Sequence, residues 1–318
     1  MSRFPMPRYP NGWFQVAYSD EVGPGDVVPL AYFGRDLVLF RSANGEARVL
    51  DAFCPHLGAH LGHGGRVEDG CLVCPFHAWR FDGDGTCVSV PYANKIPPRA
   101  TIPTWQACEK NGMIMVWYHA EGAAPAWEIP DVSEVEDEAW TSYGRHEWKI
   151  RTHNQEMAEN SCDSAHFCYL HGTQGMPEST AEAHGYLLHT HSKTRMRTPQ
   201  GEVEGTIDVH AYGFGFTTTR FTGIVETLLV SSATTIDEDQ VHLRFNLMVK
   251  NLVNAGVTST VGAAFSREIT RQLEQDIPIW ENKIYVERPM LCDGDGPIGP
   301  FRRWARQFYS KTSKEAAA

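Results

Sequence analysis

Two short motifs in the amino-terminal third of the chain each combine a cysteine with a histidine. They read Cys54-x-His56 and Cys74-x2-His77. Two thiolates and two imidazoles could hold one zinc ion, but common zinc sites place cysteine near cysteine and histidine near histidine. Each motif here mixes the two ligand types, which favours a centre with two different metal positions.

Such a centre is the Rieske [2Fe-2S] cluster, in which two cysteines bind one iron and two histidines bind the other. The segment from about Trp13 to His119 resembles a Rieske domain. Respiratory Rieske proteins carry a further cysteine in each loop, and because these loops lack it, the resemblance is to the oxygenase type. It implies four cluster ligands: Cys54, His56, Cys74 and His77.

A second set of possible metal ligands lies between residues 160 and 171. Asp163 and His166 are three residues apart and would share one face of a helix. His171 would lie about 140° further around a regular helix, so it must follow a helix end or a distortion, which Gly172 allows. Two histidines and a carboxylate with open positions are the ligand set of non-haem Fe(II) that activates oxygen.

Two aspartates compete for the carboxylate position. Asp163 is close in sequence, whereas Asp276 lies on a long helix expected from about residue 265 to 285. Asp276 falls on the apolar stripe of that helix, where an unpaired carboxylate is costly, so we expect a cation or metal opposite it. Alternatively, Asp276 caps a new helical segment beginning around Pro278. The stripe consists of Ile269, Leu273, Trp280 and Ile284.

The pattern Asp-x2-His-x4-His after a Rieske domain, with a later Gln-Asp-x3-Trp, is similar to the oxygenase component of Rieske non-haem iron oxygenases. The resemblance covers nearly the whole chain and implies that His166, His171 and Asp276 bind a mononuclear Fe(II) that activates O2. It further implies a homotrimer, in which Asp163 bridges by hydrogen bonds to a cluster histidine of a neighbouring subunit. Asn160 is expected to face the iron.

The composition describes an acidic globular protein. The chain has 318 residues, 42% of them hydrophobic, and its 28 Lys and Arg against 39 Asp and Glu give a formal net charge of -11. No basic run could neutralise several phosphates, which argues against a nucleic-acid partner. No apolar stretch approaches the roughly 20 residues that cross a bilayer, and the amino terminus lacks a secretion signal, so we expect no membrane span and a cytoplasmic location.

The patterning predicts an α+β fold with two domains. Short strands and turns, such as the one at Asn44-Gly45, indicate an all-β Rieske domain with an amino-terminal arm over residues 1–125. Pro, Gly, Ala and acidic residues at 121–138 predict a linker, with the boundary near residue 125. Residues 126–318 combine a helix at 154–170, β-rich segments and the long helix. The resemblance implies a helix-grip catalytic domain, an antiparallel sheet with a long carboxyl-terminal helix.

The sequence contains no complete dinucleotide-binding motif. The nearest match is Gly213-Phe-Gly215, which lacks the third glycine. We therefore expect that neither NAD nor flavin binds to this chain. Electrons from NAD(P)H must then arrive through a separate reductase that carries flavin and an iron–sulfur cluster.

The carboxyl-terminal segments 279–285, 289–297 and 302–309 look like those of 3-ketosteroid 9α-hydroxylase oxygenases. That resemblance implies a monooxygenase that hydroxylates a hydrophobic, steroid-like substrate. Phe214, Phe216 and Phe221 could line its pocket, although packing in the core of strands is the stronger explanation. Two alternatives stay open: an oxygenase or desaturase acting on a sterol or a smaller aromatic or polycyclic compound, and a non-catalytic Rieske electron-transfer protein. The last would not need the second domain.

Overall fold

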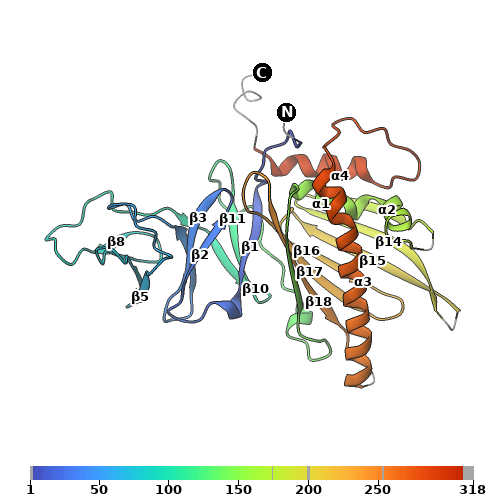
Figure 1. Ribbon diagram of the computed structural model, residues 1–318, viewed down its shortest axis with the longest axis horizontal. Helices are drawn as coiled ribbons and strands as arrows, with labels where there is room; N and C mark the ends of the chain where they lie inside the picture. The colour runs from blue at the N-terminus through green and yellow to red at the C-terminus, as the bar shows by residue number, and fades with distance from the viewer. Residues whose placement is uncertain (1–2, 174, 199–200, 253, 311–318) are drawn as a thin grey trace.

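The computed structural model describes residues 3–173, 175–198, 201–252 and 254–310. Two sheet-rich domains lie side by side in it (Figure 1). The amino-terminal domain consists of small antiparallel sheets, and the carboxyl-terminal domain has one large sheet with helices on one face. The expected α+β class is therefore confirmed. Of the helices within the described ranges, none is long and apolar enough to span a membrane.

Three small sheets build the amino-terminal domain. The first, in the order β1-β11-β10, contains β1 (Gly12–Tyr18), β11 (Met113–Tyr118) and β10 (Ala107–Lys110). The second contains β2 (Val27–Tyr32), β3 (Arg35–Arg41), β4 (Ala47–Asp51) and β9 (Thr104–Trp105). The third contains β5 (Arg66–Glu68), β6 (Cys71–Val73), β7 (Arg80–Phe81) and β8 (Cys87–Ser89). Strands β3 and β4 form the expected hairpin, with Gly45 at a φ of +90°.

The segment between β11 and the catalytic sheet is packed into the protein. It includes a short 3-10 helix, η2 (Ser133–Val135), and the boundary expected near residue 125 falls within it. Ile129, Val132 and Trp140 are buried in a cluster that also contains residues of β1, β11, β17 and β18. The two domains therefore share a hydrophobic core across this connection.

A seven-stranded antiparallel sheet forms the carboxyl-terminal domain. Its strand order is β12-β18-β17-β16-β15-β14-β13, so the first strand pairs with the last. The strands are β12 (Gly144–Ile150), β13 (Glu178–His184), β14 (Leu187–Thr198), β15 (Gly201–Tyr212), β16 (Thr217–Phe221), β17 (Thr227–Thr235) and β18 (Val241–Val249).

The helix expected over residues 154–170 is divided in three. It consists of α1 (Asn154–Glu159), the 3-10 turn η3 (Asn160–Cys162) and α2 (Ser164–Tyr169). The break occurs at Asp163, whose backbone is extended and whose carboxylate accepts hydrogen bonds from the N–H groups of Ala165 and His166. Aspartate favours this capping position over a helix interior, so it starts a new helix. The other short helices are η1 (Ser19–Glu21), α4 (Ile298–Ala305) and η4 (Arg306–Phe308).

Helix α3 (Ala255–Asn282) crosses one face of the large sheet (Figure 1). It begins about ten residues earlier than the pattern predicts, because Asn254 caps its first turn. It continues without a break through Pro278, so the alternative in which Asp276 caps a new segment is wrong. Leu273, Asp276 and Trp280 of the expected stripe are buried and Ile269 is half-buried, whereas Ile284 lies beyond the helix and is exposed.

Candidate functional site

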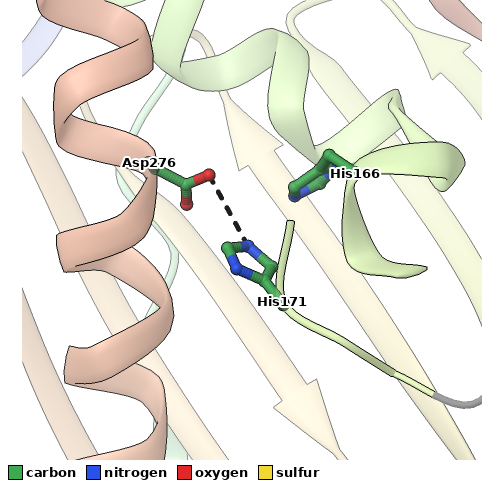
Figure 2. A group of neighbouring side chains, drawn as sticks. All are labelled: His166, His171 and Asp276. Atoms are coloured by element: carbon green, nitrogen blue, oxygen red, sulfur yellow. Dashed lines mark ion pairs between the residues drawn. The ribbon is translucent and has the colours of Figure 1, made fainter. Parts of the chain in front are cut away.

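Three side chains from separate elements converge beside the large sheet. His166 lies on α2, His171 in the turn after it, and Asp276 on α3 (Figure 2). One possible ligand atom from each of the three lies within 4.8 Å of the other two. The Nε2 atom of His171 is 3.5 Å from a carboxylate oxygen of Asp276. This arrangement brings together two imidazoles and one carboxylate, the set that suits non-haem Fe(II).

The end of α2 brings His171 back toward His166. The His171 N–H donates to the His166 carbonyl at 3.3 Å, one residue beyond the usual helical spacing. Gly172 then adopts a φ of +75°, which glycine accommodates without strain. The two imidazole centroids are 5.0 Å apart as a result. His171 thus lies past the helix end, as its spacing from His166 predicts.

Hydrogen bonds orient both imidazoles. The Nδ1 atom of His166 lies 2.6 Å from the Asp163 carbonyl oxygen, and the Nδ1 atom of His171 lies 3.0 Å from the side-chain oxygen of Gln275. Both partners are acceptors, so each Nδ1 carries the proton. Each Nε2 is then the basic nitrogen available to a metal, which is the usual arrangement of a ligating histidine. The residues present therefore fit a metal ion.

The protonation equilibria of the two histidines differ. Burial lowers the pKa of His166, despite the nearby carboxylates of Asp276 and Asp163. Burial also disfavours the charged form of His171, but its hydrogen bonds to Asp276 and Gln275 outweigh this and leave its pKa raised. A bound divalent cation would compensate the buried Asp276 carboxylate and require both imidazoles neutral.

A cavity of about 220 Å³ extends from these three residues over the floor of the sheet. Its walls are mostly apolar and come from α1, α3 and strands β14 to β18. Phe214 and Phe221 line it, whereas Phe216 does not. Residues alternate between the two faces of a strand, so Phe216 points to the face opposite Thr217. There it is buried in the core cluster that joins the two domains, which corrects its expected place in the pocket.

Asn160 and Asp163 lie close to the same three residues. Asn160 lines the cavity, and its side-chain oxygen accepts a hydrogen bond from the Trp280 indole N–H at 3.3 Å. Asp163 uses one carboxylate oxygen to cap α2, and 38% of its side chain is exposed. Its second oxygen lies 3.9 Å from the Nδ1 atom of His166.

The two Cys-His motifs lie in two loops of similar conformation. One loop connects β4 to β5, and the other connects β6 to β7. In each loop the cysteine N–H donates to a carbonyl five residues later, that of Ala59 or Trp79, at 2.9 Å. The residue four after each cysteine, Gly58 or Ala78, has a positive φ. The same turn therefore occurs twice. It places Cys54, His56, Cys74 and His77 together, with the His56 and His77 ring centroids 4.6 Å apart.

The chemistry of these four side chains fits an iron–sulfur cluster. The thiols of Cys54 and Cys74 are buried, and burial raises the pKa of Cys54 to about 11. Without a metal such a thiol stays protonated, while metal coordination removes the proton. The Nδ1 atom of His77 is buried and has no hydrogen-bond partner in the described part of the chain. A cluster iron would supply that missing partner.

Comparison with known families identifies both domains. The family model described as the Rieske [2Fe-2S] domain matches residues 12–106, and the 3-ketosteroid 9alpha-hydroxylase C-terminal domain matches residues 116–309. The chain belongs to the Rieske oxygenases. As a member of this family it is an oxidoreductase, and the predictions of a Rieske cluster and a mononuclear iron are confirmed. The alternative of a non-catalytic electron-transfer protein is excluded.

Two curated relatives are similar to this Rieske oxygenase over most of its length. It is 33% identical to "Cholesterol 7-desaturase nvd 1" of Ciona intestinalis, over 96% of the chain and 70% of the relative. It is 31% identical to "3-ketosteroid-9-alpha-monooxygenase, oxygenase component" of Rhodococcus rhodochrous, over 95% of the chain and 83% of the relative.

Solved structures share the fold at lower identity. Dicamba monooxygenase bound to dicamba matches with a TM-score of 0.79 at 19% identity, covering 97% of this chain and 98% of that one. Pseudomonas putida CBB5 NdmA with caffeine matches with a TM-score of 0.76 at 18% identity, covering 92% and 89%. These likenesses support the fold alone.

The structure adds one residue near His166, His171 and Asp276 that sequence reasoning missed. Gln275 orients His171, yet it is polar and next to Asp276, so on the sequence it reads as part of the exposed helix surface. The only signal was its place in the Gln-Asp-x3-Trp pattern.

Proposed function

We propose that this Rieske oxygenase is the terminal component of a monooxygenase that hydroxylates a steroid-like substrate, such as a 3-ketosteroid. The observation that carries the proposal is the apolar cavity of about 220 Å³ that opens onto His166, His171 and Asp276. A mostly apolar cavity suits a hydrophobic ligand. The named relative from Rhodococcus rhodochrous supports the same substrate class.

The geometry of the two sites supports the following assignment of metal ligands. His166, His171 and Asp276 would hold the mononuclear iron, and Cys54, His56, Cys74 and His77 the cluster. When bound, the iron supplies reductive activation of O2. The chain itself orients the imidazoles and holds the substrate in the cavity. Asn160, fixed by Trp280, presents its amide to the cavity beside the metal ligands.

Electron delivery requires other chains. The cluster loops lie near β5 and β8, at the far end of the molecule from α2 and its metal ligands (Figure 1). We propose a homotrimer in which the cluster of one subunit lies near Asp163 of the next, whose exposed carboxylate accepts a hydrogen bond from a cluster histidine. A separate NAD(P)H-dependent reductase would reduce the cluster.

A second outcome is desaturation of a sterol. It is favoured by the similarity to the cholesterol 7-desaturase of Ciona intestinalis. The same iron site and the same apolar cavity would serve both reactions. Hydroxylation inserts one oxygen atom into the substrate, whereas desaturation removes two hydrogen atoms from it.

A single turnover distinguishes these outcomes. Chemically reduced, iron-loaded protein is mixed with O2 and a 3-ketosteroid or a sterol, and the extracted product is analysed by mass spectrometry. A product heavier by one oxygen atom supports hydroxylation, and one lighter by two hydrogen atoms supports desaturation. If the 3-ketosteroid and the sterol are both recovered unchanged from protein with both iron centres intact, a steroid or sterol substrate is contradicted and a smaller aromatic one is favoured.

A further inference from the structure

Most polar side chains that line the cavity already have partners. Asn154, Ser161, Ser232 and Gln272 each form a hydrogen bond with another group of the chain. These side chains are therefore satisfied without a ligand. His166, His171 and Asp276 belong to the metal site.

Three hydroxyls on the cavity floor differ from these groups. Thr217, Thr219 and Ser231 line the cavity and are half-buried. Within the described ranges, no residue forms a hydrogen bond with their side chains. A hydroxyl that loses water without gaining a partner costs about 1 to 3 kcal/mol, so an apolar ligand that covered these groups would bind poorly.

Strand register places two of the three hydroxyls together. Thr217 of β16 lies directly opposite Ser231 of β17. Directly opposed residues have Cβ atoms about 4.5 to 5.5 Å apart, so both hydroxyls can reach one ligand atom. Thr219 lies two residues further along the same strand, roughly 7 Å away. It also faces the cavity, at the next inward-facing position of β16.

The pair is suited to a neutral oxygen atom. Two hydroxyls can both donate to a ketone, or one can donate to and the other accept from an alcohol. In the described part of the chain, no lysine or arginine lines the cavity, so no such side chain is available to pair with a substrate carboxylate near Thr217 and Ser231.

We propose that Thr217 and Ser231 together bind a ketone or alcohol oxygen of the substrate and so determine specificity. This inference rests on the proposed function, since it takes the cavity as the substrate site. It narrows the substrate to a neutral, mainly apolar molecule with an oxygen that reaches the middle of the sheet. Ring ketones and sterol alcohols share this chemistry.

The test compares ligands that have one carbon skeleton. Iron-loaded protein without reductant is titrated with 5α-androstan-3-one, 5α-androstan-3β-ol and 5α-androstane, and binding is followed by tryptophan fluorescence. The wild type should bind at least one of the oxygenated ligands about tenfold or more tightly than androstane. Whichever of the ketone and the alcohol binds more tightly identifies the functional group that the two hydroxyls recognise.

The double variant Thr217→Val with Ser231→Ala should abolish this preference while leaving androstane binding unchanged or tighter. The control is Thr218→Val, because Thr218 lies on the same strand but does not line the cavity. It should keep the wild-type preference. A preference that survives in the double variant would overturn the inference.

A second pair of ligands separates this inference from the steroid proposal. If no androstane derivative binds to the wild type, the steroid substrate is contradicted, and 2-decalone is compared with decalin. A preference for decalone that disappears in the double variant would uphold the hydroxyl pair alone. Equal binding of the two, or no binding, would overturn the inference as well.

Discussion

The imidazole Nδ1 of His171 lies 3.0 Å from the side-chain oxygen of Gln275, the residue immediately before Asp276 on α3. One helix therefore carries the carboxylate of the candidate metal site and also the group that orients a histidine from another element. Because α3 packs on β12 and β18, this orientation depends on the packing of the sheet as well.

Replacing Gln275 with methionine should weaken metal binding by about 10- to 100-fold, because His171 loses the acceptor that fixes its tautomer and ring orientation. Gln275→Glu keeps an acceptor and should stay close to the wild type. The measurement is competition for Co(II) between the metal-free mononuclear site and a chromophoric chelator. Gln272→Met is the matched control, since Gln272 lies one turn earlier and bonds to Glu268 instead. Equal affinity of the Gln275→Met variant and this control would contradict the role.

The ion pair between Glu159 and Arg302 should contribute strongly to stability. Two guanidinium nitrogens of Arg302 donate to the Glu159 carboxylate at 2.6 and 2.9 Å, and both side chains are mostly buried. Arg302→Met leaves a buried carboxylate without its partner and should lower the free energy of unfolding by about 3 to 5 kcal/mol. Asp20→Asn, which breaks the more exposed pair with Arg145, should cost at most about 1 kcal/mol. Urea denaturation of the three proteins measures the difference, and similar losses in both variants would count against the argument.

His242 should make the protein less stable in mild acid. Burial, followed by the Arg244 charge, lowers the pKa of His242 to about 4, although Glu147 opposes this. The unfolded histidine titrates near its usual value of about 6.5, so between these values the unfolded state binds more protons. Stability should therefore fall as the pH is lowered from about 6.5 toward 4. In His242→Gln the difference between the free energies of unfolding at pH 7 and pH 5 should shrink. His153, whose pKa burial also lowers to about 4, remains in both proteins.

The candidate ligand sets could be proposed from the sequence because most of their spacing is local. Cys54-x-His56 and Cys74-x2-His77 are short motifs, and His171 could be placed past a helix end from its offset alone. Asp276 was recognisable as a polar residue on an apolar stripe. What the periodicity of the sequence did not show depends on helix capping and on domain packing. The break at Asp163, the early start of α3 and the burial of Phe216 in the shared core follow from capping and from domain packing.

Asp163 should have two separable roles, as the cap of α2 and as a link for electron transfer. Its carboxylate accepts hydrogen bonds from Ala165 and His166, and asparagine caps a helix about as well as aspartate. Asp163→Asn should therefore keep the stability of the wild type, whereas Asp163→Ala should lose about 1 kcal/mol. If the exposed carboxylate also accepts a hydrogen bond from a neighbouring subunit's cluster, Asp163→Asn should slow reoxidation of the reduced cluster. Stopped-flow absorbance after mixing with O2 and substrate measures that rate. Wild-type reoxidation in the Asn variant would leave Asp163 as a helix cap alone.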